Sequence, residues 1–84
     1  MGKVVVYTKD DCIWCTRAKA LLTAKNIAFT AIHMPDDISR DDLLEKFPAA
    51  RTMPIITIDD VWIGGFDKLN EKVKNNELLP GQSD

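Results

Sequence analysis

The two cysteines of this chain, Cys12 and Cys15, are separated by two residues, and the sequence has no other cysteine. Residues three positions apart lie on one face of a helix, with Cβ atoms about 5–6 Å apart. A small adjustment in the first turn brings two such sulfur atoms to bonding distance. The spacing therefore predicts a dithiol that passes electron pairs by forming and opening a disulfide bond.

The residues around the pair predict different roles for the two thiols. Residues 3–8 form a continuous β-branched run typical of a strand buried on both faces, and a helical pattern runs from Ile13 to about Lys25. Cys12 then opens the helix, where unpaired N–H groups and the helix dipole stabilise an anion. We expect Cys12 to be the thiolate nucleophile and Cys15, inside the first turn, to be more buried and slower to react.

Charged side chains near Cys12 act in both directions. Asp10 and Asp11 directly precede it and disfavour a thiolate, whereas Lys9 and Arg17 offer compensating positive charge. We expect the helix end and the two cations to stabilise the Cys12 thiolate more than the two carboxylates destabilise it.

The remaining pattern predicts the elements that position the dithiol. Asn26 is expected to end the first helix, Met34-Pro35 to end the second strand, and Ser39 to cap the second helix. A hairpin with an Asp59-Asp60 turn follows. The expected ranges are a strand at 27–33, a helix from Ser39 to Pro48, strands at 54–58 and 61–63, and a helix from about 66 to 76.

This order, β-α-β-α-β-β-α, predicts an α/β fold of thioredoxin-like type. The first β-α-β unit should be parallel and right-handed and the last two strands antiparallel, which gives a four-stranded mixed sheet with helices on both faces. We expect residues 1–84 to form a single domain, with about 78–84 as a frayed tail.

Composition excludes several classes of function. The chain has 84 residues, 29% of them charged, and a net charge of −2, so neither nucleic acid nor an anionic membrane surface is expected as its main partner. The sequence has no long apolar run, and we expect a cytoplasmic protein without a signal peptide. In a reducing compartment a cysteine pair is more often catalytic or metal-binding than structural.

A zinc site is the sharpest rival to redox chemistry. Two cysteines supply half of the usual four ligands, and the only histidine, His33, lies at the far end of a predicted strand. We therefore favour a redox pair, and we assign no role to His33.

Three separated motifs, with their order and spacing, resemble those of the glutaredoxins, and the resemblance covers about residues 3–78. Short dithiol glutaredoxins of bacteria and their phages are the most similar. The motifs are Tyr7-Thr-Lys-Asp-Asp-Cys-Ile-Trp-Cys15, Arg51-Thr-Met-Pro54 and Ile63-Gly-Gly-Phe-Asp67. The resemblance implies a glutathione-dependent thiol–disulfide oxidoreductase that acts as a monomer on protein disulfides and glutathione mixed disulfides. One implied partner is ribonucleotide reductase, to which it would donate electrons.

The resemblance also implies a glutathione site. Pro54 would be a cis-proline that presents the backbone of Met53 to the tripeptide, and Phe66 and Asp67 would receive its γ-glutamyl group. Charge complementarity makes Lys9 and Arg51 the partners of the two glutathione carboxylates. The residues so implied are Lys9, Trp14, Arg51, Thr52, Met53, Pro54, Gly65, Phe66 and Asp67.

The chain departs from the family pattern between the cysteines, where Ile13-Trp14 replaces the usual Pro-Tyr. We expect this change to alter the reduction potential. Glutaredoxins without that proline tend to bind a [2Fe–2S] cluster between two protomers, so Cys12 as a cluster thiolate is an alternative. Another alternative is a thioredoxin-like donor that a flavoprotein reductase reduces. The Gly-Gly-Phe-Asp segment favours glutathione as reductant, with no metal required.

Overall fold

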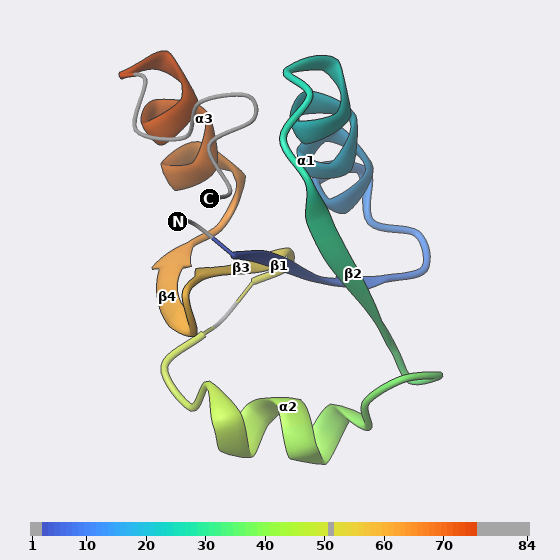
Figure 1. Cartoon of the computed structure of the whole chain (residues 1–84). Coiled ribbons are helices and arrows are strands. Elements are labelled where there is room, and N and C mark those ends of the chain that lie inside the picture. The colour runs from blue at the N-terminus through green and yellow to red at the C-terminus, as the bar shows by residue number, and fades with distance from the viewer. Residues whose placement is uncertain (1–2, 51, 76–84) are drawn as a thin grey trace.

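The computed structural model describes residues 3–50 and 52–75, and it has the predicted order of elements. Figure 1 shows four strands in one sheet, with α1 and α3 on one face and α2 on the other. The elements are β1 (Val4–Lys9), α1 (Ile13–Ala24), β2 (Phe29–Met34), α2 (Arg40–Lys46), β3 (Ile55–Ile58), β4 (Val61–Gly64) and α3 (Phe66–Lys74).

The sheet is mixed, as predicted, with strand order β2-β1-β3-β4. β1 pairs in parallel with β2 and antiparallel with β3, and β3 pairs antiparallel with β4. Because β1 is a central strand with helices over both faces, its residues are buried from Val4 to Thr8, and only Lys9 is exposed. This burial explains the unbroken apolar run in the sequence.

Alternating residues of β1 join two separate apolar clusters, since successive side chains of a strand point to opposite faces. Val4 and Val6 pack with residues of α1 and α3, including Leu22 and Leu69. On the other face the partners come from α2, the segment after it and β3: Val5, Tyr7, Leu43, Phe47, Ala50 and Ile55 form that cluster. β1 is thereby fixed from both sides, and so is the start of α1 that follows it.

The second strand begins at Phe29, so the predicted start at residue 27 is wrong. Asn26 has φ 58°, and the N–H groups of Asn26 and Ile27 donate to the carbonyls of Thr23 and Leu22, at 3.1 and 2.9 Å. This pair of bonds is a Schellman motif that closes α1. Ile27 is buried in the core as the apolar residue that accompanies such a motif, which is why its apolar character imitated a strand.

The predicted hairpin is confirmed. Asp59 and Asp60 have φ values of 52° and 68° between the paired residues Ile58 and Val61, as in a two-residue type I′ turn. The N–H of Lys3 donates to Asp59 Oδ1 at 2.9 Å, and the N–H of Asp59 donates to the Lys3 carbonyl at 2.9 Å. The turn is thus fastened to the start of β1.

The last helix ends at Lys74 with Asn75 as its C-cap, two residues before the expected end at 76. The expected frayed tail lies outside the described residues. Within residues 3–50 and 52–75, no helix has the length and apolar character needed to cross a membrane.

Truncation of the α1 core should be costly because Leu22 is completely buried. We expect Leu22→Ala to lower the free energy of unfolding by about 2–5 kcal/mol, from the lost transfer energy and the cavity left behind. Urea denaturation of the oxidised protein measures this loss. Leu44→Ala is the matched control, since Leu44 is 41% exposed on α2 and should cost less than about 1 kcal/mol. Equal losses for the two variants would contradict this description of the core.

Candidate active site

Cys12 and Cys15 lie where β1 passes into α1, and they are joined by a disulfide with a Cα–Cα distance of 5.3 Å. Cys12 is the N-cap residue of α1, with extended backbone angles, and its Sγ accepts a hydrogen bond from the Cys15 N–H at 3.2 Å. The Thr16 N–H and hydroxyl both donate to the Cys12 carbonyl, at 3.2 and 3.3 Å. These contacts hold the Cys12 sulfur against the unpaired N–H groups of the helix end.

The two cysteines differ in their exposure to solvent. Cys15 is 1% exposed, whereas Cys12 is only half-buried. An incoming thiolate or disulfide must approach the sulfur that it reacts with. The arrangement therefore favours Cys12 as the sulfur that meets the substrate and Cys15 as an internal partner.

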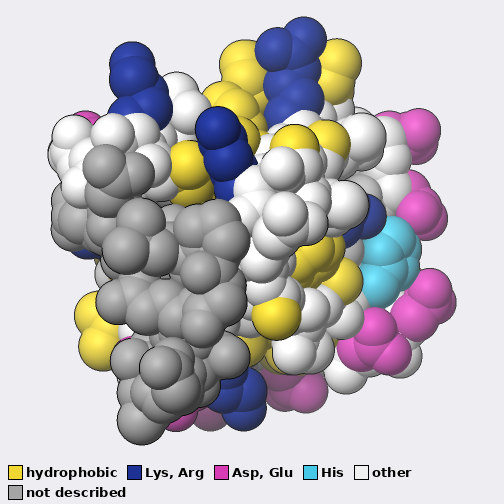
Figure 2. All heavy atoms as spheres, turned by 45° about the horizontal axis from the view of Figure 1, so that its top comes forward, with side chains coloured by type: hydrophobic (Ala, Val, Ile, Leu, Met, Phe, Trp, Pro, Cys, Tyr) yellow, Lys and Arg dark blue, Asp and Glu magenta, His cyan; other side chains and the backbone are white. Residues whose placement is uncertain are grey.

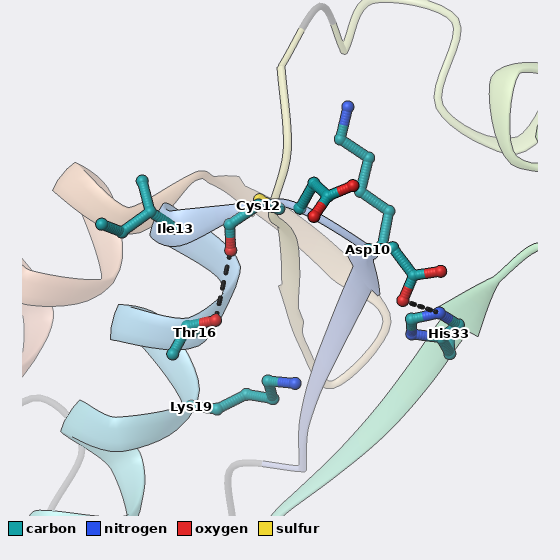
Figure 3. A pocket seen from close by; sticks show the side chains of 8 residues that line it. Asp10, Cys12, Ile13, Thr16, Lys19 and His33 are labelled. Carbon is teal, nitrogen blue, oxygen red and sulfur yellow. Dashed lines mark hydrogen bonds and ion pairs between the residues drawn. The ribbon is translucent and has the colours of Figure 1, made fainter.

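The loop between β1 and α1 turns sharply to place Cys12 at the helix start. Asp11 has φ 54°, a left-handed conformation that aspartate tolerates better than most residues. This loop borders a shallow hollow of about 650 Å³. Figure 3 shows its lining side chains, which come from β1, the loop, α1 and β2: Lys9, Asp10, Asp11, Cys12, Ile13, Thr16, Lys19 and His33.

On the β3 and β4 side of β1, two of the predicted glutathione-binding segments meet. The Met53–Pro54 peptide is cis, as predicted, and Pro54 is fully buried just before β3. A Cβ atom on Gly65 would lie 3.4 Å from the Pro54 carbonyl oxygen, so the two backbones approach closely. Gly64 has φ +128°, and a Cβ atom there would lie 2.6 Å from the Lys68 side chain. The positive φ and the close contact both favour glycine at this position.

Aromatic contacts connect the start of α1 with the start of α3. The rings of Trp14 and Phe66 have centroids 5.4 Å apart, and the Arg17 guanidinium carbon lies 5.1 Å from the Trp14 ring centroid. Trp14 nevertheless stays 48% exposed beside the dithiol. An exposed aromatic next to the reacting sulfur is suited to contact a substrate.

The remaining predicted site residues are placed less closely together. Thr52 and Asp67 are exposed, Asp67 in the first turn of α3, and Met53 packs partly into the cluster on the α2 face. Lys9 is exposed at the end of β1 and lines the hollow. Arg51 lies outside the described residues.

The sequence indicated no role for His33, but the structure places it beside the loop between β1 and α1 that leads to Cys12, here called the dithiol loop. Its Nε2 lies 3.2 Å from Asp10 Oδ1, and it lines the same hollow as Cys12. One feature of the sequence could have indicated this position of His33. The first two strands were predicted to pair in parallel, and parallel strands have their carboxyl ends at the same edge of the sheet. In the observed register Thr8 pairs with His33. That register is not visible in the sequence.

Comparison with known proteins agrees with this site. The family model described as Glutaredoxin matches residues 4–63. Glutaredoxin 3 of Escherichia coli strain K12 is 38% identical over 69 residues, a match that covers 82% of this chain and 83% of the relative. Glutaredoxin 1 of Rickettsia felis is 32% identical over 84 residues, covering 94% of this chain and 82% of the relative.

Solved structures show the same fold. Glutaredoxin 1 from Francisella tularensis, complexed with cacodylate, has a TM-score of 0.74 at 30% identity and covers 92% of this chain and 98% of its own. A buckwheat glutaredoxin–glutathione complex has a TM-score of 0.75 at 28% identity, covering 92% of this chain and 73% of its own. Together with the Cys12–Cys15 disulfide at the start of α1, these matches show that the chain belongs to the glutaredoxin family of glutathione-dependent thiol–disulfide oxidoreductases.

Proposed function

We propose that this glutaredoxin reduces protein disulfides and glutathione mixed disulfides, with Cys12 as nucleophile, Cys15 as resolving thiol and glutathione as reductant. The observation that supports this proposal most directly is that the two cysteines differ in position and burial. The accessible sulfur of Cys12 lies at the amino end of α1 and accepts the Cys15 N–H, whereas Cys15 is buried. The helix end stabilises the thiolate that must attack and that must later leave.

In the proposed cycle the Cys12 thiolate attacks one sulfur of a substrate disulfide, and the other substrate sulfur leaves as a thiolate that takes up a proton. Cys15 then gives up its proton, attacks the Cys12 sulfur and releases the second substrate thiol. One glutathione thiolate opens the resulting Cys12–Cys15 disulfide by bonding to Cys12. A second glutathione attacks that mixed disulfide, which releases oxidised glutathione and regenerates the dithiol.

A glutathione mixed disulfide needs only one enzyme thiol. Cys12 attacks the glutathione sulfur, the substrate thiol leaves, and a further glutathione releases the bound one. Cys15 takes no part in that route.

The glutathione would bind on the β3 and β4 side of Cys12. The close approach of Gly65 to the Pro54 carbonyl supports this placement, and the similar buckwheat protein forms a glutathione complex. Met53 would pair with the tripeptide backbone, and the amino end of α3 would receive the γ-glutamyl carboxylate. The proposed contacts are Lys9, Trp14, Arg51, Thr52, Met53, Pro54, Gly65, Phe66 and Asp67.

The wider assignments are also proposals. We infer a cytoplasmic location, because turnover needs a compartment that supplies reduced glutathione. We also infer that the protein acts as a monomer. Its partners would be disulfide-containing proteins, among them ribonucleotide reductase, and no metal would be required. The exposed Ile13 and Trp14 beside Cys12 offer such proteins an apolar contact.

Serine substitutions separate the two proposed thiol roles. We expect Cys12→Ser to lose all reduction of a glutathione mixed disulfide, because no other accessible thiolate remains. Cys15→Ser should stay within about threefold of the parent in that assay and should lose reduction of protein disulfides by the dithiol route. The measurement is NADPH oxidation with glutathione and glutathione reductase.

Two outcomes would contradict the proposal. Activity that survives in Cys12→Ser and disappears in Cys15→Ser would reverse the roles. Turnover of the parent protein by thioredoxin reductase, with none by glutathione, would favour the thioredoxin-like alternative.

The proposed γ-glutamyl contact is tested at Asp67. We expect Asp67→Asn to raise the KM for glutathione about tenfold, because a charged hydrogen bond to the ligand amino group is lost. The alkylation rate of Cys12 should not change. Glu71→Gln, an equivalent change at an exposed position one turn further along α3, is the control and should keep the parent KM. An unchanged KM in Asp67→Asn would remove this residue from the site.

A further inference from the structure

His33 ends up beside the dithiol loop because β1 and β2 run parallel. Thr8 and His33 are paired in the register, so the chain that leaves β1 toward Cys12 passes the end of β2. His33 Nε2 lies 3.2 Å from Asp10 Oδ1, and Figure 3 shows the two side chains pointing toward one another at the edge of the hollow. This contact joins the cysteine loop to the neighbouring strand.

The surroundings of His33 are strongly acidic. Its Nε2 lies 3.9 Å from Asp36 Oδ2, and its backbone N–H donates to Asp37 Oδ2 at 3.0 Å. Figure 2 shows acidic side chains gathered on both sides of the histidine. The His33 side chain is 27% exposed, whereas that of Asp10 is 83% exposed. The imidazole is therefore the more buried partner, with acidic residues from the loops on either side of it.

The other charged groups around His33 come from β1, the loop and α1. Lys9, Asp11 and Lys19 line the same hollow. With Asp10, the hollow beside Cys12 is therefore lined by two carboxylates, two ammonium groups and the imidazole. A carboxylate near a thiol disfavours the thiolate. Asp10 and Asp11 directly precede Cys12, and a positive charge on the His33 side chain would offset that of Asp10 across their contact.

We propose that His33 is a positioning residue for the dithiol, which holds Asp10 on the β2 side and offsets its charge, so that a larger fraction of Cys12 is thiolate. This inference rests on the proposed role of Cys12 as nucleophile. Histidine is the side chain that gains its charge near neutral pH.

A mutant cycle on the reduced full-length protein tests the proposal. Iodoacetamide, a neutral reagent, is used at several pH values and low ionic strength, and mass spectrometry follows the Cys12 peptide. We expect His33→Gln to slow the alkylation of Cys12 at pH 6 about threefold, because the Asp10 charge is left without its offset. Asp10→Asn should react at least as fast as the parent. The double variant should match Asp10→Asn, because the charge to be offset is gone.

Two further measurements separate a charge effect from a structural one. At about 1 M salt the screening length falls to about 3 Å, so the difference between His33→Gln and the parent should disappear. His33→Lys, which keeps a positive charge, should restore the parent rate at low salt. Asp60→Asn is the control, because it removes one carboxylate in the β3–β4 turn, at the opposite end of the sheet from Cys12. It should change nothing.

A parent-like pH profile in His33→Gln would overturn the proposal, and so would slow alkylation that persists in high salt and in the double variant. In either case preferential labelling of Cys12 would leave its role as nucleophile intact. Labelling of Cys15 before Cys12 in the parent protein would instead overturn the proposed function, and the role of His33 with it.

Discussion

The chemistry of this protein depends on the hydrogen bond between the Cys15 N–H and the Cys12 sulfur at the start of α1. In this bond the N-cap side chain of the helix is the one proposed to react with the substrate. The first N–H groups of a helix have no partner within the helix, and a sulfur atom placed among them is stabilised most when it carries a negative charge. The same placement would ease the proposed attack by Cys12 on a substrate and its later departure from a mixed disulfide.

The rest of the fold fixes this junction in space. β1 is buried from Val4 to Thr8 and joins one apolar cluster on each face, so the point where the chain leaves the sheet cannot shift without disturbing both. The order β2-β1-β3-β4 then gives Cys12 two different sides. On one side the backbones of Pro54 and Gly65 approach each other closely, and on the other side lies the hollow with His33.

Local signals in the sequence predicted most of the fold and the centre of the site. The Cys-x-x-Cys spacing, the Asp59-Asp60 turn and the apolar run of β1 each depend on near neighbours, and the structure agrees with them. Ile27 misled the prediction because a buried apolar residue that closes a helix has the same character as the first residue of a strand. His33 was missed for a different reason. Its contact with Asp10 exists only through the register of two strands separated by a helix, which no local pattern encodes.

The most direct test is a pH titration of the thiolate absorbance of Cys12 in the reduced Cys15→Ser variant, where Cys12 is the only cysteine. If the helix end stabilises the thiolate, it should hold the pKa of Cys12 well below the ordinary cysteine value. A pKa at or above the ordinary cysteine value of about 8.5 would show that α1 does not activate this sulfur, and it would contradict the account.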